Sequence, residues 1–388
     1  MVTGHSPNHL YLFPSMQFDF STILFYSFLL AAGIQVIYWL FFLIGLVRIS
    51  KSREDDLASN DGISIIVAAR NEIENLKLLI PALLNQDHPN YEVIIVNDRS
   101  DDGSDVFLIE EEQKYAKLKA LHIYDLPEHF SAKKYALTLG IKAASNKQVL
   151  LTDADCLPSS ESWASNMANG FKDGNDIVLG FSSYNKLPGF LNYFIRFETL
   201  LTGIEYLASA ANQLPYMGVG RNLAYKKDLF LENKGFFGYQ DTIGGDDDIF
   251  INKHSTSRNT GLVVLQEAIT LSKPKTSFKD FWRQKIRHLH VGKSYSFKSK
   301  AILAIFNLSW IFTWILGAWC LATENNWQLV AYGLLLREII LFSSFILVTK
   351  KSGIAFEMAG IIFVDILYVI YYIFVGTKAL IVKTISWA

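Results

Sequence analysis

Residues 63–97, ISIIVAARNEIENLKLLIPALLNQDHPNYEVIIVN, read as a strand, a helix and a second strand. The β-branched run at 63–69 predicts the first strand, and 92–97 predicts the second. Between them, leucines and isoleucines recur at helical spacing from Leu76 to Leu84, until Pro89 ends the pattern. Asn71 is followed three residues later by Glu74, which is the pattern of a capping box, so we expect Asn71 to cap this helix.

The same alternation continues along the chain. We expect a helix near 104–117, a strand at 119–124, a helix at 132–144 and a strand at 148–152. Strands that alternate with helices predict an α/β domain built on a parallel sheet. Ligands of such domains bind beyond the carboxyl ends of the strands, which here carry Arg70, Asn71, Asp98, Asp153 and Asp155.

The composition of the 388-residue chain is unusually apolar, with 51% hydrophobic and 19% charged residues. Soluble proteins average roughly 45–50% apolar and about 25% charged residues. The net charge of -1 argues against a general nucleic-acid binder. Two cysteines, Cys156 and Cys320, are too few for a disulfide framework.

The apolar residues are gathered in blocks at 21–47, 301–322, 327–348 and 354–376. Each block is long enough to cross a hydrocarbon core of about 30 Å, whereas buried helices without a polar face are rare in soluble domains. Basic residues follow the first block instead of preceding it, so it is an anchor and not a signal peptide. We therefore predict an N-terminal segment, a membrane helix and about three further transmembrane helices, at 1–20, 21–48 and 301–383.

Basic residues flank these blocks and indicate the orientation in the membrane. With the N-terminus outside, three groups of basic residues fall on the cytoplasmic side, together with the region 52–290. These groups are Arg48, Lys51 and Arg53; Lys293, Lys298 and Lys300; and Lys350 and Lys351. Lys378 and Lys383 do not fit this scheme and leave the orientation of the last segment open. We predict an integral membrane protein, located in the plasma membrane if its source is a bacterium, with the domain between the apolar blocks in the cytoplasm.

Two charged neighbours, Arg337 and Glu338, interrupt the third apolar block. Charged residues inside membrane segments are functional candidates by default. Adjacent residues point to different faces of a helix, so we expect that these two are not partners. A structural or interfacial placement and a role in substrate binding both stay open.

Two acidic motifs are the candidates for chemistry. Asp153 and Asp155 flank Ala154 at the end of a buried-looking strand, where their oxygens could hold a hard divalent cation. Asp246, Asp247 and Asp248 follow two glycines and precede a helical stretch at 249–258. Acids are favoured at a helix N-terminus by its dipole; alternatively, their crowding raises one pKa and produces a general base.

An aromatic and basic stretch, FWRQKIRHLH at 281–290, stands directly before the second apolar block. Gln284, Arg287 and His288 are spaced to share one helix face. We predict an amphipathic interfacial helix within 277–300. Its basic residues either meet lipid head groups or close over an anionic phosphate or an acceptor.

Taken in order, these motifs resemble those of membrane-bound, inverting family-two glycosyltransferases with a GT-A domain, over roughly 62–292. Asn97, Ala132 and His288 replace an acid, a glycine and a tryptophan of the family pattern. The segments that carry the resemblance are VAARNE at 67–72, VNDRSDDGS at 96–104, AKKYAL at 132–137, TDAD at 152–155, GVGRNLAY at 218–225, GGDDDIF at 244–250 and QKIRH at 284–288.

The resemblance implies a catalytic domain at 52–276 that binds a nucleotide-diphospho-sugar and Mg²⁺ or Mn²⁺. Asp155 is favoured over Asp153 as the direct metal ligand, and Asp247 is favoured over Asp246 as the catalytic base. The residues implied on the nucleotide-sugar side are Ala69, Arg70, Asn71, Glu72, Asp98, Lys133, Asp153, Ala154, Asp155, Gln284, Arg287 and His288. Those implied on the acceptor side are Gly220, Arg221 and Asn222.

The expected reaction is the transfer of one or a few sugars to a hydroxyl of a membrane-associated acceptor, either a lipid or a saccharide. A processive polysaccharide synthase that also exports its product is an alternative within enzymes. A non-catalytic membrane scaffold is a second alternative, although a scaffold needs none of the acids at 98, 153, 155 and 247. The identities of the sugar, nucleotide and acceptor are not encoded in these motifs.

Overall fold

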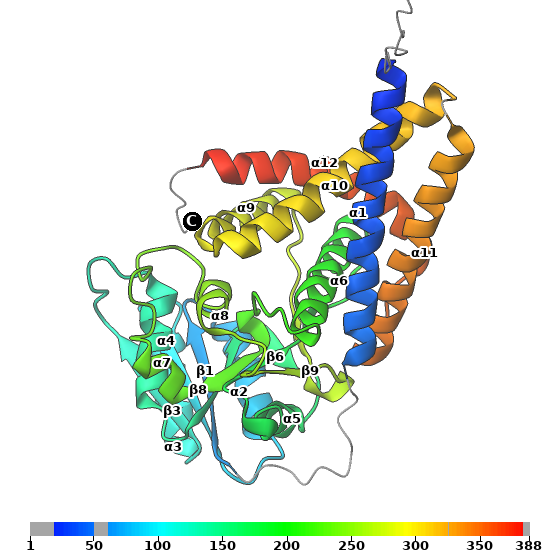
Figure 1. Ribbon diagram of the computed structural model, residues 1–388. Coiled ribbons are helices and arrows are strands. Elements are labelled where there is room, and N and C mark those ends of the chain that lie inside the picture. Colours follow the sequence, from blue (N-terminus) through cyan, green and yellow to red (C-terminus); the bar gives the residue numbers. More distant parts are fainter. Residues whose placement is uncertain (1–18, 50–60, 325, 383–388) are drawn as a thin grey trace, which may run out of the picture.

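The computed structural model describes residues 19–49, 61–324 and 326–382 of the chain. An α/β domain lies beside a group of long helices, and the N-terminal helix runs through that group between the α/β domain and the outermost helix (Figure 1). Most of the predicted N-terminal segment 1–20, and the basic residues Lys51, Arg53 and Lys383, lie outside the described residues.

The α/β domain is built on a seven-stranded sheet with the order β3-β2-β1-β4-β8-β6-β9. Its first four strands are parallel, as predicted, but β8 runs antiparallel to both β4 and β6. The sheet is therefore mixed. The strands are β1 (Ile63–Ala69), β2 (Tyr91–Asp98), β3 (Leu118–Ile123), β4 (Gln148–Asp153), β6 (Ile177–Gly180), β8 (Leu223–Lys226) and β9 (Thr260–Val263).

A second sheet of three short strands stands next to the acidic end of β4. Its order is β5-β10-β7, with β5 (Cys156–Pro158), β10 (Thr270–Ser272) and β7 (Ser182–Tyr184). The helices of the α/β domain are α2 (Ile73–Leu84), α3 (Ser104–Lys114), α4 (Ala132–Ala143), α5 (Trp163–Asn169), α6 (Phe190–Ala211), α7 (Lys227–Glu232), α8 (Asp248–His254) and α9 (Phe278–Val291). Single turns lie at η1 (Lys172–Gly174), η2 (Gly220–Asn222), η3 (Gln266–Ala268), η4 (Gly292–Ser294) and η5 (Met358–Gly360).

The N-terminus of α2 differs from the prediction. Asn71 has a φ of 55°, so its side chain points away from the helix, and its Oδ1 accepts a hydrogen bond from Asp101 N at 2.9 Å. The free N–H of Ile73 is instead satisfied by Asp102 Oδ2 at 2.9 Å. The predicted capping box was therefore wrong, because the cap comes from the loop after β2 and not from the chain before the helix.

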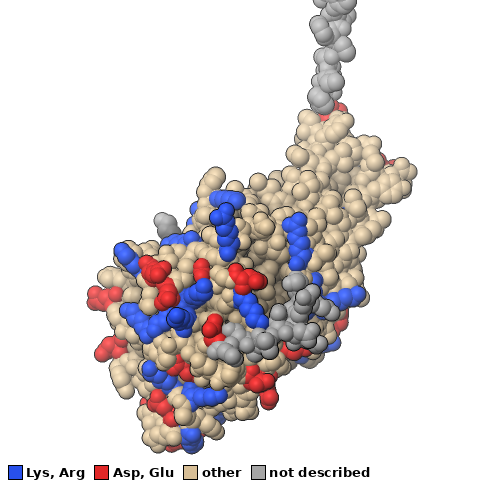
Figure 2. Space-filling view, turned by 60° about the horizontal axis from the view of Figure 1, so that its bottom comes forward, with Lys and Arg blue, Asp and Glu red and all other residues tan. Residues whose placement is uncertain are grey.

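Within the described residues, four helices are long and apolar enough to cross a membrane, one before and three after the α/β domain, which confirms the predicted number. They are α1 (Phe20–Arg48), α10 (Phe297–Ala322), α11 (Trp327–Ser352) and α12 (Ile361–Ile381). Figure 2 shows charged side chains gathered over the α/β domain, while the surface of the helical part is almost free of them. The helices indicate a membrane protein.

The hydrophobic core on one face of the sheet continues into the long helices. Ile66 and Ile141 of the α/β domain belong to the same buried cluster as Trp39 of α1 and Phe345 of α11. Helix α6, which the sequence analysis did not predict, connects the two parts because it packs along α1. Gly45 of α1 lies so close to the backbone of Ala208 in α6 that a side chain would not fit. The α/β domain and the long helices therefore share one packed core.

A buried polar cluster joins the long helices. The Arg337 guanidinium binds both oxygens of Asp365, at 2.6 and 3.0 Å, and also contacts Glu338. Trp314 Nε1 donates to Asp365 Oδ2 at 2.6 Å. The expectation that Arg337 and Glu338 are not partners was wrong, because the long arginine side chain reaches its neighbour while it faces Asp365. Arg337 and Asp365 are fully buried, which favours a structural pairing over contact with substrate.

We expect Arg337→Met to lower the free energy of unfolding by about 3–5 kcal/mol, because it leaves Asp365 buried without a counter-charge. Thermal unfolding of the purified protein in detergent, followed by size-exclusion chromatography, measures the change. Arg48→Met is the matched control, since Arg48 is exposed and donates to Asn212 Oδ1 at the membrane edge. An unfolding midpoint of Arg337→Met equal to that of Arg48→Met would contradict the structural role of the cluster.

Candidate active site

The carboxyl ends of the parallel strands carry the predicted polar residues. Ala69 and Asn97 are register partners in β1 and β2, and Ala68 pairs with Asp153 in β4. The chain therefore brings Arg70, Asp98 and Asp153 to one edge of the sheet, as the sequence analysis expected for an α/β domain.

Lys133, in the first turn of α4, joins the two acidic motifs. Its Nζ lies 2.8 Å from Asp153 Oδ1 and 3.0 Å from Asp246 Oδ2. Burial opposes the charge of this lysine, but the carboxylates of Asp153 and Asp246 outweigh burial and raise the pKa of Lys133 well above its ordinary value. Burial likewise acts to raise the pKa of Asp246, yet Lys133 holds that pKa below its usual range. Asp246 therefore stays ionised.

Asp153, Asp155 and Cys156 could hold a metal ion, because their ligand atoms all lie within 4.8 Å of one another. Burial, and then the charge of Asp153, raise the pKa of Asp155. Two carboxylates that repel each other in this way gain most from a hard divalent cation, whose preferred ligands are oxygens. The Cys156 thiol lies 3.2 Å from Asp155 Oδ1, and burial raises its pKa well above its ordinary value, so the thiol stays protonated and is a poor ligand.

Asp247 occupies the N-cap of α8, so the helix-dipole explanation of the acidic run applies to it. Its Oδ1 accepts from Asp248 N at 2.8 Å, and its Oδ2 accepts from Gly220 N at 2.6 Å. Burial, followed by the charge of Asp246, nevertheless raises the pKa of Asp247. The two explanations are therefore compatible: the helix terminus fixes the orientation of a carboxylate whose affinity for a proton is increased.

Part of the α/β domain matches a known protein family. Residues 64–232 match the family described as glycosyl transferase family 2. The chain carries a family 2 glycosyltransferase domain. The predicted family and the GT-A fold are thereby confirmed, and the match covers β1 to β4 with both Lys133 and the pair Asp153 and Asp155.

Two curated relatives are similar over part of their length. The probable glycosyltransferase YdaM of Bacillus subtilis is 25% identical over 267 residues, which cover 64% of this chain and 61% of the relative. The poly-beta-1,6-N-acetyl-D-glucosamine synthase of Staphylococcus epidermidis is 35% identical over 95 residues, which cover 24% of this chain and 22% of the relative. The chain thus spans less than two thirds of the length of either relative.

One solved structure shares the fold. The mannosyltransferase PcManGT from Pyrobaculum calidifontis, in complex with GDP-Man and Mn²⁺, superposes with a TM-score of 0.56 at 17% identity. The similarity covers 86% of this chain and 98% of that structure. At this identity the comparison shows a common fold and leaves the substrate of this glycosyltransferase domain open.

The loops after β1 and β2 carry the residues predicted on the nucleotide side. Asp98 is 4% exposed and pairs with Arg99, whose Nε lies 2.7 Å from Asp98 Oδ1. Glu72 binds Asn75 Nδ2, and burial raises the pKa of Glu72. Ala69 and Ala154 are buried, so only their backbone atoms can line a site. Arg70 is exposed. The Asn71 side chain binds the backbone of the loop after β2.

The three residues predicted on the acceptor side have different surroundings. Gly220 N binds Asp247, and the Arg221 guanidinium lies over the Tyr184 ring, 4.4 Å from its centre. Asn222 is fully buried: its amide donates to Phe181 O and Ala268 O, and its Oδ1 accepts from Trp163 Nε1. The Asn222 side chain is therefore part of the core and offers no surface to an acceptor, contrary to the expectation.

Helix α9 brings its predicted face towards the site. Gln284 Nε2 lies 3.4 Å from the Tyr184 hydroxyl, next to Arg221. Burial lowers the pKa of Arg287, while the charges of Asp246 and Asp153 act in the opposite direction. His288, the third member of this face, is exposed to solvent.

Lys134 is a positioning residue that the sequence analysis missed. It is fully buried, and its Nζ donates to three backbone carbonyls of the loop before Asp246: Tyr239 O at 2.9 Å, Thr242 O at 2.6 Å and Gly244 O at 2.6 Å. The sequence contained a sign that this lysine is buried, because Lys134 stands on the apolar stripe of α4 with Leu137 and Ile141. The adjacent lysines of α4 thus hold the same segment, residues 239–246: Lys133 pairs with the Asp246 carboxylate, and Lys134 binds the backbone carbonyls before it.

We expect Lys134→Met to lower the kcat of sugar transfer by about 100-fold, because the loop that carries Asp246 and Asp247 loses its common donor and shifts. Steady-state kinetics in detergent micelles, with donor binding measured separately, checks this. Lys227→Met is the matched control: Lys227 also donates to two carbonyls of the domain, Lys142 O and Ala144 O, but at the other end of α4. Equal losses of kcat in the two variants would show that general destabilisation, and not the loop, is responsible.

Proposed function

We propose that this chain transfers a sugar from a nucleotide-diphospho-sugar to a hydroxyl of a membrane-associated acceptor, with inversion at the anomeric carbon. The observation that carries the proposal is the bridge formed by Lys133 between Asp153 and Asp246. It brings the acids that suit a metal ion for the donor diphosphate within one side-chain length of the acids that suit proton removal. A non-catalytic scaffold would not need this convergence.

On the donor side, Asp155 and Asp153 would hold Mg²⁺ or Mn²⁺, for which their clustered oxygens are suited. Bound there, the cation would supply positive charge to the departing diphosphate. The presence of GDP-Man and Mn²⁺ in the PcManGT structure supports this assignment. Lys133 and Arg287 add cations of the chain itself on the same side, where negative charge develops on the leaving group.

On the acceptor side, Asp247 is the proposed base. Two backbone N–H groups fix its carboxylate, and its raised pKa increases its affinity for the hydroxyl proton. Asp246 is less suited, because Lys133 holds its pKa down. The hydroxyl would attack the anomeric carbon as Asp247 takes its proton, from the face opposite the nucleotide, so one displacement inverts the configuration without a covalent intermediate.

The acceptor is proposed to be a lipid or a saccharide at the membrane surface. Helix α9, next to the site, exposes Phe278 by 60% and Trp282 by 37%, and α10 begins close behind it. We infer the domain division expected from the sequence, a catalytic domain at 52–276 and an interfacial segment at 277–300. We also infer that the catalytic domain faces the cytoplasm, because Arg48, Lys293 and Lys351 lie on its side of the long helices.

A second candidate is a processive polysaccharide synthase, which the similarity to the Staphylococcus epidermidis synthase favours. Incubating the purified chain with a panel of radiolabelled nucleotide sugars and native membrane lipids, and counting the sugars added per acceptor, separates the two. We expect one or a few sugars per acceptor. Long products would overturn that preference.

We expect Asp247→Asn to lower the rate of transfer by about 10²–10⁴-fold, because the amide cannot accept the acceptor proton. Binding of the nucleotide sugar, measured by titration calorimetry, should be retained. Asp241→Asn is the control, since Asp241 is an exposed acid in the preceding loop. Unchanged transfer by Asp247→Asn would refute the assigned base.

Chelation tests the proposed metal. We expect EDTA to abolish transfer by the wild type and added Mn²⁺ or Mg²⁺ to restore it, because Asp155 and Asp153 would otherwise repel the donor diphosphate. Asp155→Asn should require a higher metal concentration for half-maximal transfer. Full activity of the EDTA-treated, dialysed enzyme would contradict metal assistance.

A further inference from the structure

The segment that leads into α12 begins on the α/β side of the long helices. Gly353, directly after α11, lies against Gln266 of the α/β domain. Glu357 then binds Arg196 of α6, with Arg196 Nη1 2.9 Å from Glu357 Oε2, and the Glu357 carbonyl accepts from the Tyr193 hydroxyl at 2.8 Å. The segment between α11 and α12 therefore stays in contact with the α/β domain.

The end of α12 returns to the same side. Lys293 Nζ donates to Leu380 O and to Val382 O, both at 3.0 Å. Lys293 belongs to the turn between α9 and α10, before α10 enters the apolar region. The last turn of α12 therefore lies at the entry point of α10, on the α/β side.

The deepest contact of α12 is near the middle of the other helices. Asp365, close to its start, binds Arg337 halfway along α11 and Trp314 in the second half of α10. A 21-residue helix is about 30 Å long, which would be just sufficient to cross a bilayer if its ends lay on opposite sides. Instead, α12 runs from this middle level back to the α/β side. Figure 1 shows it lying across the directions of α1 and α11.

We propose that α12 is a re-entrant helix that does not cross the bilayer, so that its last turn lies on the same side as the α/β domain. It packs beside α9, with the Phe281 and Tyr371 rings stacked at 5.9 Å. Its outer face fits the acyl chains of the leaflet on that side. This face is a stripe at helical spacing whose members are between 39% and 61% exposed: Phe363, Ile366, Ile370 and Phe374.

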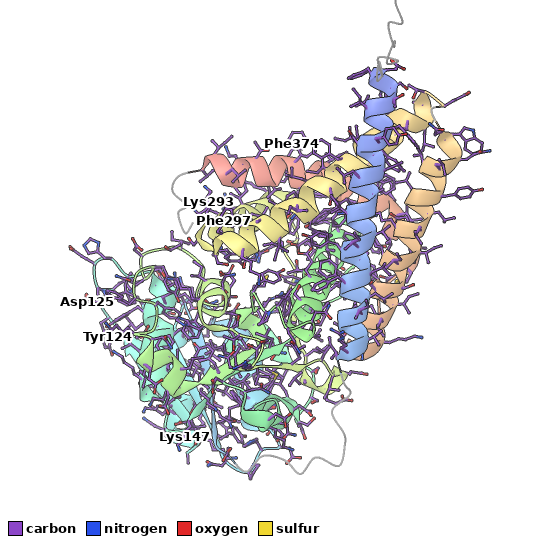
Figure 3. The ribbon with its side chains drawn as sticks, in the orientation of Figure 1. Tyr124, Asp125, Lys147, Lys293, Phe297 and Phe374 are labelled. Atoms are coloured by element: carbon purple, nitrogen blue, oxygen red, sulfur yellow. The ribbon has the colours of Figure 1, made fainter. Side chains whose placement is uncertain are left out.

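Figure 3 places Phe374 on the side of α12 turned away from the α/β domain, and Lys293 and Phe297 near the end of that helix. The charges agree with this arrangement. Asp365, at the deep end, is neutralised by Arg337, whereas Lys378 stands in the last turn, at the membrane surface. Lys378, which does not fit four crossings, joins the other basic residues on one side when α12 does not cross.

Labelling with a membrane-impermeant maleimide, in intact cells and in inverted vesicles, tests the proposal on the full chain. One variant carries a cysteine added after Ala388. Lys147→Cys marks the α/β side, Glu324→Cys marks the opposite side, and both residues are exposed. The parent chain gives the background, because Cys156 and Cys320 are buried. We expect the terminal cysteine to react from the same side as Lys147→Cys; reaction from the side of Glu324→Cys would overturn the proposal.

Depth measurements provide an independent test. Spin labels at Phe363→Cys, Ile370→Cys and Leu380→Cys report depth through their relative collision rates with oxygen and a water-soluble nickel complex. For a re-entrant helix we expect the depth to decrease steadily from 363 to 380. A maximum of depth at 370, with both ends shallow, would show a crossing helix and refute the proposal. Neither experiment depends on enzymatic activity, so the outcome is separate from that of the proposed function.

Discussion

The site depends on one ammonium group between two sets of carboxylates. The Lys133 Nζ contacts both Asp153 and Asp246, in surroundings that screen charges poorly, so it offsets the repulsion between the two sets of acids. Lys133 keeps Asp246 ionised, whereas burial, and then the charge of Asp246, raise the pKa of Asp247. The position of Lys133 follows in turn from the packing of α4 on β1 and β2. A helix that stabilises the sheet thereby also determines the protonation of the site.

Most of the α/β frame could be predicted because its signals are local. The strands 63–69 and 148–153 and the helix 132–143 follow from runs and spacings of apolar residues within a few turns. The capping of α2 could not be predicted, since it depends on the positive φ of Asn71 and on an acid from another loop. The pairing of Arg337 with Asp365 could not be predicted either, because the two residues lie on different helices and no spacing rule connects them.

The candidate site was predicted in part, for a similar reason. The rule that ligands bind at the carboxyl ends of parallel strands placed Asp98, Asp153 and Asp155 at one edge. The order of the motifs added Lys133 and the acids at 246–248. The role of Lys134 could not be derived, because its partners are backbone carbonyls about a hundred residues further along the chain, and no side-chain pattern encodes them. For Asn222 the error is the opposite one: the motif predicted a residue that faces the acceptor, whereas all the hydrogen bonds of its amide are made inside the core.

The contact between Gly45 of α1 and Ala208 of α6 has a consequence for acceptor selection. Because backbone meets backbone there, and one core extends from Ile66 to Phe345, the joint resists tilting of the α/β domain against the long helices. Asp247 is then held at a constant height above the bilayer. An acceptor must present its hydroxyl at that height, so the proposed reaction selects acceptors by how far their reactive group projects from the lipid surface.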